Sequence, residues 1–216
     1  MADELPPDAR PRHAGDGPDD PALLLQASRR IDWRFLLPRP QLACIVYIGR
    51  HDAALIGALR AHADLTIVGA DTDQPSPSAF DLAVLKDASL GSISAGRDLV
   101  RPGGWVYAEV RRVLRHHGAA PAGARPVSRW RRAFVDTGLT EVTAHWHVPN
   151  HDAAAFLVPL GDPAGVRLVL RRHQGSAAGH AKAMAGRLLA ATGLIELAVR
   201  DASVLGRRPP LDGGRR

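Results

Sequence analysis

The sequence has one cysteine and few aromatic residues, which limits the disulfides, the metal sites and the kind of core that it can form. Cys44 is the single cysteine among 216 residues, so an internal disulfide and a cysteine-rich zinc site are both excluded. Aromatic residues make up 5% of the chain, so leucine, valine, isoleucine and alanine must fill most of a core. No signal peptide is recognisable, and no apolar run approaches the roughly 18 residues of a membrane-spanning helix. We therefore expect a cytoplasmic protein of one domain with tails.

Lysine is also scarce, occurring only at Lys86 and Lys182, so the net charge of +6 is carried almost wholly by arginine. Such a charge can indicate a nucleic-acid partner. The arginines form short pairs far apart in the sequence instead of one block, which favours solvated surface residues. We therefore do not expect nucleic acid as a partner.

The composition divides the chain into a domain and two tails. Residues 1–20 are acidic and Pro-rich with almost no large apolar side chains, so they are expected to be a disordered arm. Residues 206–216 hold glycine, proline and arginine and are expected to be a disordered basic tail. Residues 21–205 remain as the folded domain, with a helix starting near Pro21.

Short apolar runs alternate with helical patterns along this domain. Such a succession is typical of a parallel α/β sheet. The expected strands are residues 43–49, 65–68, 81–85, 105–110, 140–148 and 166–172. The expected helices are residues 53–61, 90–100, 129–137 and 177–200, with a possible break at Gly193.

Three stretches in this order resemble the class I S-adenosylmethionine (SAM)-dependent methyltransferases. The stretch 45–49 reads IVYIG, the stretch 80–85 reads FDLAVL, and the stretch 99–107 contains the turn Pro-Gly-Gly. The resemblance implies a doubly wound, mostly parallel Rossmann-like α/β sheet that ends in an antiparallel strand pair. Only about nine residues, 71–79, precede the third apolar run, and a crossover needs about ten or more. We therefore predict a reduced sheet that lacks the family's third strand.

The resemblance also implies SAM as the cofactor and places four residues of this chain around it. Gly49 corresponds to the glycine-rich turn after the first strand, and His51 follows two residues later. Asp71 corresponds to the acid that accepts hydrogen bonds from both ribose hydroxyls, although it also suits a turn. Asp87 follows the third apolar run, at the end of a strand where open α/β sheets bind ligands.

The turn departs from the family pattern at three positions. Tyr47 stands where the family has an acidic residue, and His51 and Ala53 stand where it has glycines. Glycines at these positions let the backbone approach the methionine part of SAM without a side chain between them. The sequence therefore predicts a damaged cofactor-binding turn.

Two carboxylates are candidates for catalysis. Methyl transfer is an in-line displacement, so an enzyme must align the nucleophile and remove its proton where it carries one. Asp87 could be that base, and Glu109 at the end of the next strand could assist it. Alternatively, Asp87 caps the following helix.

Other side chains have simpler explanations. His145 and His147 would share one strand face and could approach a metal, but no third or fourth ligand beyond His151 or Asp152 lies at a fixed short spacing. We expect instead a solvated strand face and no metal. The apolar face of residues 177–200 could pack on its own domain or form a homodimer.

Two functions remain open at this point. The first, which we favour because most proteins of this fold are enzymes, is a SAM-dependent methyltransferase of a small molecule, such as a sugar or a natural product. The alternative is a non-catalytic methyltransferase-like protein that binds a ligand or a protein partner. Tyr47, His51 and Ala53 favour the alternative, whereas Asp71 and the Pro-Gly-Gly turn favour the methyltransferase.

Overall fold

The structure is a computed structural model that describes residues 21–68, 75–87, 89–111, 125–172, 184–189, 191–192 and 194–211. The helical segments with stated bounds are α1 (Pro21–Arg30), η1 (Asp32–Leu36), α2 (Ala53–Arg60), α3 (Ser92–Leu99), α4 (Val127–Asp136), α5 (Pro163–Arg172) and α7 (Ile195–Ala198). The strands are β1 (Cys44–Gly49), β2 (Asp64–Val68), β3 (Phe80–Lys86), β4 (Val100–Arg111), β5 (Thr140–Val148), β6 (Phe156–Pro159) and β7 (Asp201–Arg207).

The strands form one mixed sheet in the order β2-β1-β3-β4-β7-β5-β6. Strands β2, β1, β3 and β4 are parallel to one another. Strand β7 lies antiparallel between β4 and β5, and β6 is antiparallel to β5. This order confirms the predicted α/β sheet with antiparallel strands at the C-terminal end. Strand β2 forms one edge, so among the described residues the sheet lacks a third strand beyond it, as predicted.

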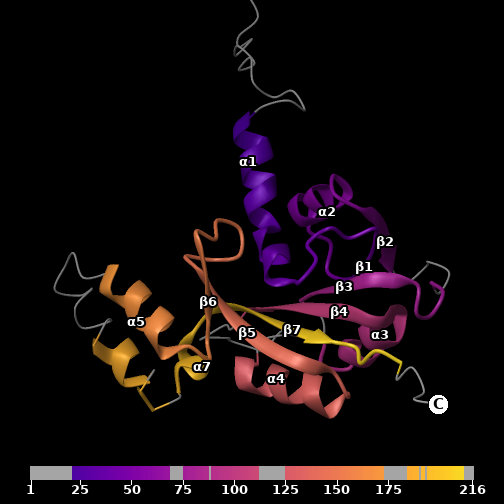
Figure 1. Cartoon of the computed structure of the whole chain (residues 1–216). Coiled ribbons are helices and arrows are strands. Elements are labelled where there is room, and N and C mark those ends of the chain that lie inside the picture. The colour runs from indigo at the N-terminus through magenta and orange to yellow at the C-terminus, as the bar shows by residue number, and fades with distance from the viewer. Residues whose placement is uncertain are drawn as a thin grey trace, which may run out of the picture.

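Helices cover both faces of the sheet. In Figure 1, α1 and α2 lie above the sheet, and α3 and α4 lie below it. Successive strand residues therefore contribute to opposite cores: Val84 and Tyr107 pack on the α1/α2 side, and Leu85 and Ala108 on the α3/α4 side. Every residue of β3 is buried, which explains why this run is apolar without alternation.

The strand expected at residues 166–172 is wrong, because these residues belong to helix α5. Val166, Val169 and Leu170 are buried at a helical spacing, so their branched side chains line one helix face. Pro163 occupies the first helical position, where its missing N–H costs nothing. The Asp162 carboxylate accepts hydrogen bonds from two backbone N–H groups of the first turn.

Strand β7, and not the segment 166–172, pairs with β5. It extends through Arg207, so it continues into the segment 206–216 that was expected to be a tail. A Cβ atom on Gly206 would lie 2.7 Å from a ring carbon of Phe134 and 3.2 Å from Leu139. The glycine therefore lets α4 pack directly on the strand, and it does not mark the end of the fold.

The other expected helices and the Pro-Gly-Gly turn can be compared with the structure. The helices expected at 53–61, 90–100 and 129–137 are confirmed by α2, α3 and α4. The Pro-Gly-Gly turn is an irregularity inside β4, with Gly103 at φ +82°. Residues 1–20, 173–183, 190 and 193 lie outside the described residues. Of the helix expected at 177–200, residues 184–189 and 195–198 are helical, and the described residues 192 and 194 between them form turns. The described part of the chain holds no helix that is long and apolar enough to cross a membrane.

Candidate functional site

The parallel register brings three of the singled-out positions side by side at the carboxyl edge of the sheet. Gly49 of β1 pairs with Lys86 of β3, and Lys86 pairs with Glu109 of β4. Asp87 follows Lys86 directly. The residues at the ends of β1, β3 and β4 thus form the place where open α/β sheets bind ligands.

A cluster of buried charges fills this edge. Arg30, the last residue of α1, donates from Nη1 to Oε1 of Glu109 at 2.5 Å and from Nη2 to Oε2 at 3.0 Å. Lys86 donates from Nζ to Oε2 of the same carboxylate at 2.5 Å. Asp52 accepts from Arg30 Nη2 at 3.1 Å, and its Oδ2 lies 3.5 Å from Lys86 Nζ. We call Arg30, Asp52, Lys86 and Glu109 the ion cluster.

The cluster is closed to solvent at its centre. The Arg30 side chain is 3% exposed and that of Glu109 is 2% exposed. Burial alone would raise the pKa of the Glu109 carboxyl, but the charges of His151, Arg30 and Lys86 outweigh burial and hold its pKa well below the usual range. A carboxylate held in this way is a weak base.

Asp52 lies in the ion cluster because it begins helix α2. It is the N-cap of α2, where its Oδ1 accepts a hydrogen bond from the Leu55 N–H at 3.0 Å. Burial alone would raise its pKa, but this hydrogen bond and the two neighbouring cations lower it. Its second oxygen is therefore an ionised partner for Arg30 and Lys86.

The turn after β1 is packed tightly against β3. Gly49 has φ +124°, and a Cβ atom there would lie 1.9 Å from the Lys86 carbonyl oxygen. Because a neighbouring strand requires this glycine, its presence is explained without a ligand. The Tyr47 hydroxyl donates to the Arg50 carbonyl, so the side chain that replaces the family's acid closes the turn.

Two further predicted cofactor residues lie near this edge. His51 is exposed in the segment between β1 and α2. Asp87 is half-buried with φ +47°, a conformation that is uncommon outside glycine. Its alternative role as a helix cap is wrong, since the N-cap of α3 is Gly91, which makes no side-chain cap bond. Asp71 lies outside the described residues.

The histidines of β5 are buried, so the expectation of a solvated face is wrong. His145 and His147 point to the same face, as predicted, and are 6% and 1% exposed. His147 Nε2 lies 2.9 Å from Ser203 Oγ, and His151 contacts Asp201 and the Ala202 carbonyl. Within the described ranges, no group of three or more potential ligands could hold a metal ion.

Sequence reasoning missed Arg30 and Asp52. Arg30 belongs to one of many arginine pairs, and nothing in its neighbours distinguishes a buried guanidinium from a solvated one. Asp52 did carry a signal, because an aspartate directly before an expected helix is typical of an N-cap.

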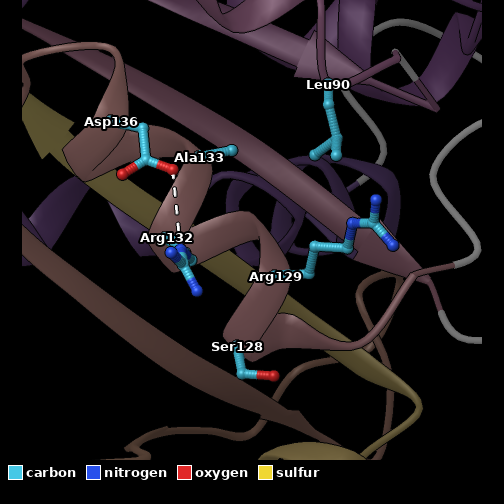
Figure 2. A pocket seen from close by; sticks show the side chains of 6 residues that line it. All are labelled: Leu90, Ser128, Arg129, Arg132, Ala133 and Asp136. Carbon is cyan, nitrogen blue, oxygen red and sulfur yellow. Dashed lines mark ion pairs between the residues drawn. The ribbon is translucent and has the colours of Figure 1, made fainter.

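Two pockets of the surface lie outside the centre of the ion cluster. One of about 640 Å³ follows the outer side of α4, where Arg132 pairs with Asp136 (Figure 2). Another of about 810 Å³ lies between the ends of β4 and β5 and the C-terminal helical segments. Neither is lined by Gly49, His51 or Glu109.

The residues at the ends of β1, β3 and β4 therefore do not fit SAM in the arrangement that the structure shows. A cofactor at the first turn needs free space against glycine backbone. Here Gly49 pairs with Lys86 of the neighbouring strand, and the side chains of Arg30 and Lys86 both pair with Glu109 at the end of β4.

Comparison with known proteins gives similarity to solved structures alone. No family model matches the chain, and no curated protein matches its sequence. Among solved structures, it is similar to a SAM-dependent methyltransferase of Thermotoga maritima, a possible histamine N-methyltransferase, with 7% identity over 87% of this chain and 92% of that one, at a TM-score of 0.46.

Two other solved structures give similar values. A putative methyltransferase of Bacillus halodurans shows 9% identity over 84% of this chain and 99% of that one, at a TM-score of 0.47. A putative methyltransferase of Haloferax volcanii, solved with the activator Trm112, shows 10% identity over 89% and 94%, at a TM-score of 0.43. Similarity at this level carries no argument about activity or ligand, so the function must be argued from the site.

Proposed function

We propose that this chain is a non-catalytic methyltransferase-like protein that acts by binding a ligand or a partner. The observation that carries the proposal is the fully buried carboxylate of Glu109, held by both Arg30 and Lys86 where the family resemblance would place SAM. A cofactor could enter only by breaking these pairs, and an unpaired buried charge costs several kcal/mol.

The chemistry of the candidate catalytic residues supports the same conclusion. Glu109 has a lowered pKa and is surrounded by donors, so it has little tendency to take a proton from a methyl acceptor. Tyr47 replaces an acid and binds its own turn. The retained α/β sheet then serves as a scaffold, which is consistent with the general separation of fold from function.

Calorimetric titration with SAM and with S-adenosylhomocysteine tests the proposal. We expect no heat of binding, corresponding to a dissociation constant weaker than about 1 mM for both compounds. The alternative, a small-molecule methyltransferase, requires binding to one or both. A dissociation constant of about 100 μM or tighter for either compound would reject the non-catalytic proposal.

A further inference from the structure

The hollow of about 810 Å³ at the carboxyl ends of β4 and β5 has the features of a ligand pocket. Its volume lies within the range of about 300–1,000 Å³ that is typical of small-molecule sites. Arg111 ends β4 on one side, and Asp201 begins β7 beside it. The pocket is therefore at the ligand-binding edge of the sheet, displaced from the ion cluster toward the antiparallel strands.

Apolar side chains from separate segments form the body of the pocket. They come from β5, α5, the helical residues 184–189 and the segment around α7, and include Trp146, Leu170, Leu189, Ile195 and Val199. The helical segments that supply them are packed closely, since a Cβ atom on Gly186 would lie 2.7 Å from Leu170. An apolar wall with an aromatic ring suits a ligand with an apolar body.

The two carboxylates at the rim of the pocket form ion pairs with cations of the protein. Asp201 is bound by Arg111 Nε at 3.1 Å and by His151 Nδ1 at 3.1 Å. Asp152 lies 3.4 Å from Arg30 Nε and 3.7 Å from Arg111. Both carboxylates of the rim therefore lie within 4 Å of a cation, with Arg111 shared between them.

Arg200 differs from these residues. It lines the same pocket and is exposed, and within the described part of the chain it has no carboxylate partner. Among the described lining residues, Arg200 is thus the charged side chain without an ion pair. Its guanidinium is a planar fork that binds carboxylates in two parallel hydrogen bonds.

We propose that this pocket binds a small carboxylic acid with an apolar, flat or aliphatic body, whose carboxylate pairs with Arg200. The apolar body lies against Trp146 and the leucine and valine side chains of the wall. The inference rests on the proposed function, because it names the ligand class of a protein that binds without transferring a methyl group.

Matched probes test the assignment on the full chain. Naphthalene-2-acetate and naphthalene-2-acetamide share one apolar body, and only the first carries a charge. In calorimetric titrations we expect the acid to bind at least tenfold more tightly than the amide, a difference of about 1.4 kcal/mol. Arg200→Gln should weaken binding of the acid about tenfold and leave binding of the amide unchanged, because the lost interaction is ionic.

Arg60→Gln is the control, since Arg60 is an exposed arginine on α2 that does not line the pocket; it should bind both probes as the original chain does. Equal affinity for acid and amide, no binding of the acid at about 1 mM, or an unchanged affinity in Arg200→Gln would each overturn the assignment. Titration of the same preparation with SAM separates the two proposals. Heat with SAM rejects the non-catalytic function, whereas the acid-to-amide ratio alone decides the pocket's ligand.

Discussion

Replacement of Glu109 by glutamine probes the ion cluster directly. The substitution keeps the size of the side chain and removes its charge, so the guanidinium of Arg30 and the ammonium of Lys86 lose the carboxylate that both contact at 2.5 Å. Asp52 remains as a counter-ion for the two, at 3.1 and 3.5 Å. Because Arg30 is 3% exposed, water cannot replace the missing charge.

The unpaired cations should lower the free energy of unfolding. Breaking a buried ion pair by removing one partner costs about 3–5 kcal/mol, a large share of the roughly 5–15 kcal/mol by which domains are stable. Urea denaturation followed by tryptophan fluorescence should show a midpoint lowered by about 1–2 M, given a slope of about 2–3 kcal/mol per M.

Glu141→Gln is the matched control. Glu141 pairs with Arg207 at 2.7 Å, but its side chain is 52% exposed, so its loss should cost no more than about 1 kcal/mol. Replacing all four charges of the cluster together, as Arg30→Met, Asp52→Asn, Lys86→Met and Glu109→Leu, should recover much of the stability. If Glu109→Gln is as mild as the control, the cluster is solvated and the reasoning fails.

Two further predictions concern stability. Gly49→Ala should destabilise the fold by about 3 kcal/mol in urea denaturation, since the added Cβ meets the Lys86 carbonyl and φ is +124°; Gly57→Ala, in open space on α2, should instead stabilise by about 0.5–1 kcal/mol, and equal effects would contradict the packing argument. Burial lowers the pKa of His145 to about 4, whereas the pKa in the unfolded chain is about 6.5. The free energy of unfolding is therefore highest above pH 6.5 and falls as the pH drops from 6.5 toward 4, because the unfolded chain binds the proton first. By pH 5 this loss amounts to about 2 kcal/mol, and it should shrink in His145→Gln but persist in the exposed-site control His51→Gln.

The sequence predicted the parallel half of the fold well, because its signals are local. Strands β1 and β3 are buried on both faces and read as continuous apolar runs. The short connector before residue 80 also predicted that the described residues form no third strand beyond β2. These inferences needed only the length of a run and the reach of the chain.

The antiparallel half was harder to predict because its signals depend on tertiary contacts. Helix α5 contains the run Val166–Leu170, whose branched residues suit either a strand or a buried helix face. Strand β7 ends near Gly206, a residue that suggests a tail until the close packing of Phe134 is known.

The candidate site shows the same limit. Glu109 was placed correctly at a strand end, because strand ends can be read from apolar runs. Its buried partner Arg30 comes from α1, 79 residues away from Glu109. No sequence pattern links the two, so the change from a potential base to a closed ion pair was visible only in the fold.

We propose that the ion cluster occupies the place that a cofactor would need. Equilibrium dialysis of the full chain against labelled SAM tests this most directly, since dialysis detects weak binding without relying on heat. We expect equal label on both sides of the membrane at protein concentrations of about 100 μM. An excess of label on the protein side, displaced by S-adenosylhomocysteine, would contradict it.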